Sequence, residues 1–287
     1  MKPNKIEQAG VVTKIWYEVE RGGLNLDFLL SSDRHHDSKY CDRDLEKRQL
    51  DEAVKRDAMV IDAGDILDAM QGKWDPRRSY DDMRPEYMVE KYYDAIIEDA
   101  EAFYKPYAAN LLLIGRGNHE TSVLKHASIS MIDRLVGGLH KAGSSVISGG
   151  YGGWVIVYLI VGNSRSSFKI KYFHGSGGDA PVTKGVIQTN RQAVYLPDAD
   201  LVLNGHNHQE YTLSIKRERV STKGVIHYDL VHFVRTPGYK TGYTDPATWD
   251  YQHTAPSPIG AVWLNIKTAP QSNSTVYPRA TLTADIV

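Results

Sequence analysis

Acidic, imidazole and amide side chains recur along this chain in five short motifs. In chain order the motifs are Asp33-Arg34-His35, Gly64-Asp65-Ile66-Leu67-Asp68, Gly117-Asn118-His119-Glu120, His174-Gly175 and Gly205-His206-Asn207-His208. Together they offer enough oxygen and nitrogen donors for two adjacent metal ions. Carboxylates and imidazoles without thiolates suit Mn, Fe or Zn rather than a soft metal. Any single motif could arise by chance, but the ordered set predicts metal-assisted hydrolysis.

Composition indicates a globular protein without a strong electrostatic field. The chain has 287 residues, 41% of them hydrophobic, and a net charge of -1. That length can bury a sizeable core. Because the motifs must converge, we expect a single domain that spans residues 1–287. The near-zero charge leaves nucleic acid possible as a partner but does not indicate it. The single cysteine, Cys41, excludes a disulfide framework.

Secretory signals and membrane spans are both recognised by a continuous apolar stretch. Residues 1–23 lack the continuous apolar stretch of a secretory signal, and no later run approaches the length of a membrane span. We therefore expect a cytoplasmic protein with no membrane partner.

Three short apolar runs each end at a motif, and we predict that each is a buried strand. They cover residues 24–30, 58–65 and 110–114. Helices are predicted over 44–57, from about 83 to 104, and over 121–143. From Trp154 onward the sequence is β-rich with little helix, which implies a second sheet. Because ligands in α/β sheets collect beyond the carboxyl ends of parallel strands, the motifs should meet at one edge.

Two stretches have no periodicity and are predicted to be loops, residues 70–82 and 236–258. Long loops inside compact domains are usually functional or disordered. We predict that the second loop lines the substrate entrance and offers the flat faces of Tyr239, Tyr243, Trp249 or Tyr251. The alternative is that these rings pack onto the second sheet as a structural lid.

The ordered motifs resemble the signature of the calcineurin-like metallophosphoesterase superfamily, which reads Asp-x-His, Gly-Asp-x-x-Asp, Gly-Asn-His-Glu or Asp, His, and Gly-His-x-His. The resemblance spans Asp33 to His208 and leaves both ends of the chain uncovered. It implies an α/β fold, a four-layer αββα sandwich with two mixed β-sheets flanked by helices. It also implies two divalent metal ions, with Mn as the first expectation and Fe or Zn as alternatives.

The resemblance also assigns metal ligands, residue by residue. The expected ligands are Asp33, His35 and His208 for one ion, Asn118, His174 and His206 for the other, and Asp65 as the bridge. A shared carboxylate would offset the repulsion between two cations roughly 3.5–4 Å apart. His206 and His208 stand at i and i+2, and in a turn after a strand they could serve two different ions. Gly117 and Gly205 are expected to let the backbone turn sharply.

Catalytic and substrate-binding residues follow from the same resemblance. His119 would lie above the metals and donate a proton to the leaving group, a contribution of roughly 10²- to 10⁴-fold. Asp68 would orient and charge that imidazole. Arg116 could grip the substrate phosphate or form a structural salt bridge. His36 could contact substrate or cap a loop.

Departures from related patterns narrow the expected branch. Purple acid phosphatases resemble this layout but have Gly at the position of His35 and a Tyr ligand at that of Asp68. Ser/Thr protein phosphatases share the string Arg-Gly-Asn-His-Glu, but they carry an arginine where this chain has Ala69. The nearest pattern is that of the phosphodiesterase and nuclease branches.

These observations predict a dinuclear metal-dependent phosphodiesterase that hydrolyses a small-molecule or nucleotide phosphate ester by in-line attack of a metal-bridging hydroxide. A phosphomonoesterase is the first alternative. A nuclease is the second, and its electrostatic footprint would be a basic strip such as Lys216, Arg217 and Arg219. From another class, a scaffold could retain the metals and serve as a binding module.

Overall fold

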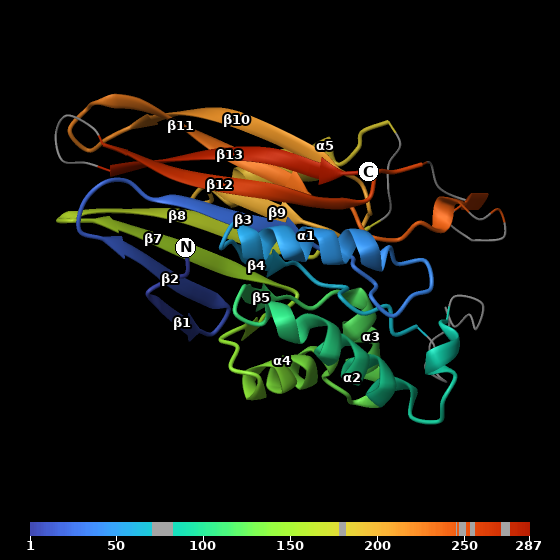
Figure 1. Cartoon of the computed structure of the whole chain (residues 1–287). Helices are drawn as coiled ribbons and strands as arrows, with labels where there is room; N and C mark the ends of the chain where they lie inside the picture. The colour runs from blue at the N-terminus through green and yellow to red at the C-terminus, as the bar shows by residue number, and fades with distance from the viewer. Residues whose placement is uncertain (71–82, 178–181, 245, 247–250, 253–255, 271–275) are drawn as a thin grey trace.

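The computed structural model describes residues 1–70, 83–177, 182–244, 246, 251–252, 256–270 and 276–287. Most of the first expected loop, residues 71–82, lies outside these residues, as does Trp249. Among the described residues the chain forms two mixed sheets with helices packed against them (Figure 1). This architecture confirms the predicted α/β sandwich.

The first sheet has six strands among the described residues, in the order β13-β12-β3-β4-β5-β6. Strands β3 to β6 run parallel to one another, whereas β12 is antiparallel to both β3 and β13. The strands are β3 (Asn25–Ser31), β4 (Met59–Asp62), β5 (Leu111–Ile114), β6 (Ile147–Ser148), β12 (Gly260–Pro270) and β13 (Val276–Ile286).

The second sheet has seven strands among the described residues, in the order β1-β2-β7-β8-β9-β11-β10. Its parallel pairs are β2 with β7, β8 with β9, and β9 with β11. The strands are β1 (Lys5–Ala9), β2 (Val12–Val19), β7 (Gly152–Val161), β8 (Ser164–Phe173), β9 (Leu201–Asn204), β10 (Tyr211–Val220) and β11 (Ile226–Arg235).

Helices cover the outer faces of both sheets. Leu50 of α1 and Leu135 of α4 pack with Val60 on the outer face of the first sheet. Between the sheets, Phe28 packs with Val157 and Leu203. On part of the outer face of the second sheet, Ala193 of α5 packs against a cluster that includes Val202 and Phe233. The α-helices are α1 (Arg43–Lys55), α2 (Tyr92–Tyr104), α3 (Asn118–Ala127), α4 (Met131–Lys141) and α5 (Val186–Tyr195), and short 3₁₀ turns are η2 (Pro85–Tyr87), η3 (Lys105–Tyr107) and η4 (Gly242–Thr244).

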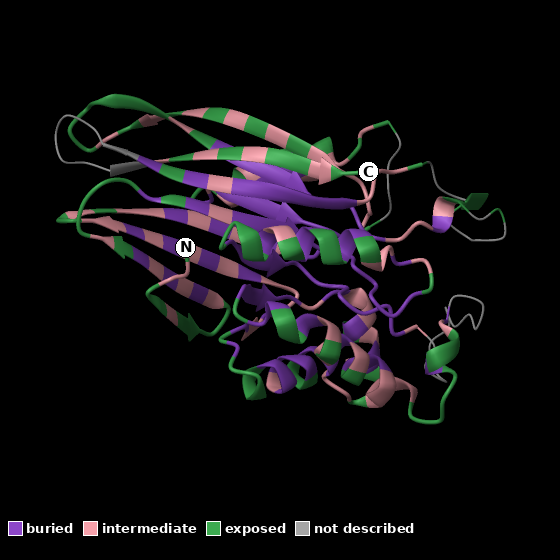
Figure 2. Cartoon of the chain, viewed as in Figure 1, coloured by how far each residue is buried: buried purple, intermediate pink, exposed green. Residues whose placement is uncertain are grey.

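The three predicted apolar strands are confirmed as β3, β4 and β5. Every residue of β4 and β5 is buried, which explains why their sequences are continuously apolar rather than alternating. Figure 2 shows the contrast with β10, whose residues alternate between intermediate and exposed. With helices on one side and the second sheet on the other, β4 and β5 have no solvated face, and their one charged residue, the terminal Asp62, is buried as well.

Two predicted helices differ from the observed ones. The stretch from 83 to 104 is helical only from Tyr92, because Pro85 follows an extended Arg84 and starts a separate 3₁₀ turn. The stretch from 121 to 143 is broken into α3 and α4 at Ser128, whose φ of 56° is left-handed and ends the first helix. Helix α3 also begins earlier than predicted, at Asn118, which places part of the third motif in its first turn.

Elements at the two ends of the chain were not predicted. Strands β1 and β2 extend the second sheet, and β12 and β13 extend the first. Helix α5 was missed because its buried face includes the polar Thr189 and Gln192, so it lacks an apolar stripe. Gln192 instead exchanges side-chain hydrogen bonds with Asn204 at the end of β9. In the described residues, every helix is too short or too polar to cross a membrane.

Candidate metal centre

Every motif follows the carboxyl end of a strand. Asp33 follows β3, Asp65 follows β4, Asn118 follows β5, His174 follows β8 and His206 follows β9. The first three strands belong to one sheet and the last two to the other. The site is therefore built where the strand ends of the two packed sheets meet, as the strand-end rule predicts.

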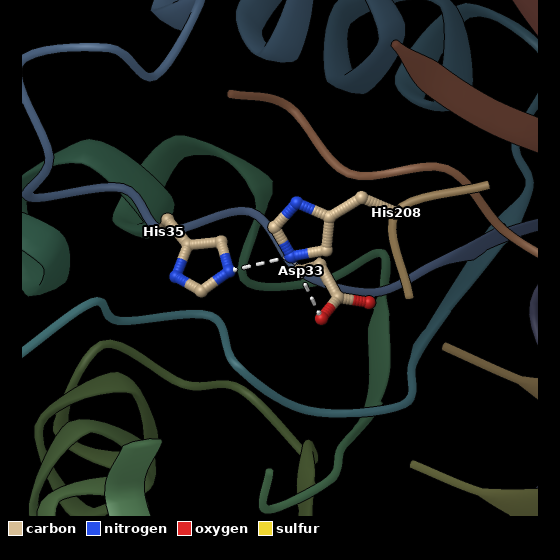
Figure 3. Close-up of side chains that lie close together, drawn as sticks. All are labelled: Asp33, His35 and His208. Carbon is tan, nitrogen blue, oxygen red and sulfur yellow. Dashed lines mark hydrogen bonds and ion pairs between the residues drawn. The ribbon is translucent and has the colours of Figure 1, made fainter. Parts of the chain in front are cut away.

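One cluster, which we call the first half-site, consists of Asp33, His35 and His208 (Figure 3). Nε2 of His35 lies 3.1 Å from Nε2 of His208, and the latter lies 3.4 Å from Oδ1 of Asp33. The three potential ligand atoms lie within 4.8 Å of one another. Nitrogen and oxygen lone pairs that converge in this way suit a divalent cation.

A second half-site consists of Asp65, His174 and His206. Nε2 of His174 lies 3.1 Å from Oδ2 of Asp65 and 3.0 Å from Oδ1 of Asn118. The same amide oxygen is 2.7 Å from Nδ1 of His206. The structure thus brings the seven expected ligands close together, and a further group of His35, Asp65 and His119 connects the two half-sites.

A buried carboxylate oxygen tests whether these residues fit a metal ion. Oδ1 of Asp33 is buried and has no hydrogen-bond partner among the described residues. It lies 3.4 Å from Nε2 of His208 and 3.9 Å from Nε2 of His174, one histidine from each half-site. A buried oxygen without a partner is costly, and a cation held by the surrounding donors would satisfy it. The residues fit a divalent metal.

The electrostatics of the cluster favour ionised carboxylates. Burial raises the pKa of Asp33, but the imidazoles of His174 and His208 more than offset this effect and bring its pKa down to about 2. Burial opposes protonation of His174, yet Asp65 and Asp33 raise its pKa to about 10. A proton and a metal ion therefore compete for the same site, so metal affinity must depend on pH.

Unusual backbone conformations accompany the ligands. Positive φ angles occur at five of the seven predicted ligands, Asp33, His35, Asp65, His206 and His208. Such conformations cost a non-glycine residue of order 1–3 kcal/mol each and persist only where surrounding structure imposes them. His206 and His208 therefore lie in a turn rather than on an extended strand. They still reach different half-sites.

Two glycines are required for close approach rather than for a sharp turn. Neither Gly117 nor Gly205 has the positive φ expected of a turn glycine. A Cβ at Gly117 would collide with the carboxylate of Asp65, and one at Gly205 would collide with Ser32 and Asp33. Each glycine thus leaves room for one acidic ligand.

His119 and Asp68 lie next to the ligands. Nδ1 of His119 is 2.6 Å from the backbone carbonyl of Asp68, and its Nε2 is 3.8 Å from Oδ2 of Asp65. The carboxylate of Asp68 is farther from this ring, with Oδ1 3.8 Å from Nδ1. The same oxygen lies only 2.9 Å from Nδ1 of His35. Asp68 therefore positions His119 through its backbone and faces His35 with its side chain.

The five residues predicted to contact substrate lie in different environments. His36 is fully buried and pairs with Glu46 at 2.8 Å, and Tyr239 is fully buried with its hydroxyl donating to Gln49. Both lie in the core, so neither is available to substrate. Arg116 lies 3.6 Å from Asp133 in a salt bridge, its alternative role. Tyr243 is half-buried 5.2 Å from the exposed ring of Tyr251, and Trp249 lies outside the described residues.

A buried ion network behind the first half-site was not predicted. Arg34, between two predicted ligands, is almost fully buried and bonds through Nε to Asp62 at 2.8 Å and through Nη1 to Glu46 at 3.1 Å. Its guanidinium stacks 4.9 Å from the ring centre of Tyr239. The network ties the end of β3 to the end of β4. A buried charge at the middle position of Asp33-Arg34-His35 carries no sequence signal of its own.

Glu120 and Lys240 complete the surroundings of the site. The carboxylate of Glu120 accepts backbone hydrogen bonds from Asp65, Leu67 and Gly117, which is a structural role. Nζ of Lys240 lies 3.4 Å from Oδ1 of Asp68. Lys240 is 172 residues from Asp68 in the chain, so no local motif could reveal the pair.

Comparisons with known proteins add little to this geometry. No protein-family model and no curated protein matches the chain. Among solved structures, it is similar to a predicted phosphoesterase from Streptococcus pneumoniae TIGR4, at 10% identity over 91% of this chain and 99% of that chain, with a TM-score of 0.32. It is also similar to Chaetomium thermophilum Vps29, at 9% identity over 90% and 95% of the two chains and a TM-score of 0.36.

A further similar structure is GAP50, described as the anchor in the inner membrane complex of Plasmodium, at 12% identity over 89% of this chain and 88% of that chain, with a TM-score of 0.37. At these identities and TM-scores the likeness carries no argument about function. The functional case rests on the motifs, on the α/β sandwich and on the two half-sites, which together agree with the architecture that the motif resemblance implies.

Proposed function

We propose that this protein is a metal-dependent phosphoric ester hydrolase that uses two divalent ions and prefers phosphodiesters. The observation that supports the proposal is the convergence of two ligand half-sites below a partly exposed histidine, His119. A single ion site would need only one such cluster. Two clusters that share the His206–His208 turn suit a two-metal hydrolase.

Within this proposal each group has a defined task. The first half-site holds one ion, the second holds the other together with Asn118, and Asp65 lies between them. When bound, the ions would neutralise phosphoryl oxygens and activate the attacking water. Mn is the first expectation, with Zn or Fe as alternatives, because the donors are carboxylate, imidazole and amide groups.

His119 is the proposed general acid. Its Nδ1 is fixed by the carbonyl of Asp68, so a second proton on the ring must sit on Nε2. That atom lies on the side of Asp65 and is part of a ring that is only partly exposed. From this position Nε2 can protonate the leaving oxygen of an ester held at the half-sites, which is the step that general acids accelerate.

Charge supports a diester over a monoester. A monoester is a dianion at neutral pH and gains more than a diester from an extra cation beside the metals. Arg116 and Lys240, two cations near the motifs, already have the carboxylates of Asp133 and Asp68 as partners. A nuclease is less favoured, because Arg217 and Arg219 both pair with Asp229 instead of forming an unpaired basic strip.

A substrate profile tests the proposal. The full chain is stripped of metal and reloaded with Mn²⁺, Zn²⁺ or Fe²⁺, and kcat/KM is measured for a nitrophenyl diester, the matching monoester and a cyclic phosphate. We expect the highest value for the diester. A preference for the monoester would assign the protein as a phosphatase. Bound metal without turnover of any ester would favour the scaffold.

A further inference from the structure

The two half-sites differ in the group that contacts Nδ1 of His35 in the first and Nδ1 of His174 in the second. His35 points Nε2 toward His208, and its Nδ1 lies 2.9 Å from the carboxylate of Asp68. His174 points Nε2 toward Asp65, and its Nδ1 lies 3.2 Å from the backbone carbonyl of Ala63. The rings are oriented alike, but one is backed by a carboxylate and the other by a neutral carbonyl.

We propose that Asp68 and Lys240 are positioning residues for the first half-site, and that the carboxylate of Asp68 acts on the metal ion there through His35. The inference rests on the proposed function, because it requires ions at the half-sites. A carboxylate behind a ligating histidine fixes the tautomer, orients the ring and makes the facing nitrogen a stronger donor. The second half-site has no equivalent charge behind His174 among its described contacts.

Distances separate this role from the role that the sequence assigned to Asp68. Oδ1 of Asp68 is 2.9 Å from the His35 ring but 3.8 Å from the His119 ring. The hydrogen-bond partner of His119 is instead the backbone carbonyl of residue 68, at 2.6 Å. A side-chain substitution at Asp68 therefore leaves the anchor of His119 in place while it removes the charge behind His35.

The contact between Asp68 and His35 is short and buried. Oδ1 of Asp68 lies 2.9 Å from Nδ1 of His35, and both side chains are almost fully enclosed. Asp68→Asn keeps the shape of the side chain but removes its charge, so it tests the charge behind His35. Asp37 holds the Asp68 loop from the other side, because its carboxylate accepts the backbone N–H groups of Asp68 and Ala69.

Lys240 supplies a positive charge beside the carboxylate of Asp68. Its Nζ is 3.4 Å from Oδ1 of Asp68, and both side chains are largely buried, so the cation offsets part of the cost of burying that carboxylate. The backbone around Lys240 is fixed, since Tyr239 donates to the carbonyl of Asp33 and Thr241 to that of Tyr40. The cation is thus anchored to the first ligand loop itself.

Metal titration tests the proposal without relying on turnover. The metal-free full chain and its variants are titrated with Mn²⁺ by calorimetry, and bound metal is counted after dialysis. We expect two ions in the wild type and, in Asp68→Asn, a loss of about 10- to 100-fold in affinity for one ion only. Lys240→Met should shift the same ion by less, and Lys240→Arg should restore it. Lys171→Met, a half-buried lysine beside Trp154, is the matched control and should change neither.

A double-mutant cycle identifies the half-site that is affected. Once His35→Ala has removed the ligand, Asp68→Asn should cost no further metal affinity, because coupled residues are not additive. Equal weakening of both ions, or lower turnover with both affinities unchanged, would overturn the proposal and leave the proposed function standing. A wild type that binds no ion would instead overturn the proposed function. If Asp68→Asn does not fold, Lys240→Met, which leaves the Asp68 carboxylate itself in place, decides by the same readout.

Discussion

The two half-sites each contain one aspartate and two histidines, but the residues that support these side chains differ. The first is assembled from the loop after β3 and the turn after β9, and Arg34, which stands between two of its residues in the chain, pairs with Asp62 and Glu46. The second is assembled from the ends of β4, β8 and β9, and Nδ1 of its His174 lies 3.2 Å from the backbone carbonyl of Ala63. A symmetric set of motifs has therefore produced two unequal sites, because the groups behind the ligands differ.

Substitution of Asp65 is expected to have the largest effect, because it should affect both half-sites at once. Asp65→Asn keeps the shape but removes the carboxylate charge proposed to serve both ions, so both should be lost together with hydrolysis. The loss in kcat/KM should exceed roughly 100-fold, since changes to groups behind the ligands alone cost 10- to 100-fold. Metal analysis after dialysis and turnover of the diester measure it.

Asp229→Asn serves as the control for Asp65→Asn, because Asp229 is a carboxylate paired with arginines on the distant β10–β11 hairpin. It should retain metal and activity. Two tightly bound ions in Asp65→Asn with near-normal activity would remove Asp65 from the centre of the site and end the idea that the half-sites are joined.

His119→Ala should separate catalysis from metal binding in both half-sites. We expect unchanged metal content and a fall in kcat of roughly 10²- to 10⁴-fold for substrates with poor leaving groups. The loss should shrink for nitrophenolate, because departure is then easy. The measurement is kcat across leaving groups of different pKa, and an equal loss throughout would assign His119 to phosphoryl-oxygen stabilisation instead.

A pair of glycines sharpens the comparison further, because each makes room for the acid of one half-site. Gly205→Ala should crowd Ser32 and Asp33 and weaken the first ion by at least about tenfold, or ~1.4 kcal/mol. Gly117→Ala should crowd Asp65, which serves both ions, and weaken both. Calorimetric titration with Mn²⁺ measures each affinity.

Gly137→Ala is the matched control for the glycine pair. Gly137 lies in α4, where an added Cβ meets nothing within 4 Å. It should bind metal normally and gain up to about 1 kcal/mol of helix stability. If all three alanines leave metal binding unchanged, the close approach of these glycines to the ligands has no functional consequence.

The smallest expected effect concerns the loop outside both half-sites. Tyr251→Ala should raise KM for an aryl diester about two- to tenfold, the range that corresponds to an aromatic contact of ~0.5–1.5 kcal/mol, and should leave a small alkyl diester unaffected. Tyr228→Ala, an exposed tyrosine on β11, is the control. Lower thermal stability with equal effects on both substrates would show that the loop is structural.

Sequence reasoning reached the ligands because each motif is local and each follows a predicted strand. Parallel strands of one sheet carry their carboxyl ends to the same edge, so Asp33, Asp65 and Asn118 could be expected to meet despite their separation in the chain. The partners of those ligands were not predictable. Asp68 faces His35 because of how two loops pack, and Lys240 reaches it from a segment that follows β11.

The same limit explains the errors in the fold. Tyr239 belongs to a segment whose composition predicts an exposed loop. Its ring instead stacks on Arg34 and its hydroxyl donates to Gln49, and neither contact is visible in a local sequence pattern. The break at Ser128 interrupts an apolar periodicity that continues on both sides of it, so one long helix was predicted. Helix α5 packs through polar residues and gave no periodic signal.

The central claim is that the half-sites hold two ions close enough to share Asp65. Electron paramagnetic resonance of the Mn²⁺-loaded full chain tests it most directly, combined with a count of bound metal. We predict two ions per chain and a spectrum of exchange-coupled Mn²⁺, which reverts to an uncoupled signal or disappears in Asp65→Asn. One ion per chain, or two ions with uncoupled spectra in the wild type, would contradict the account.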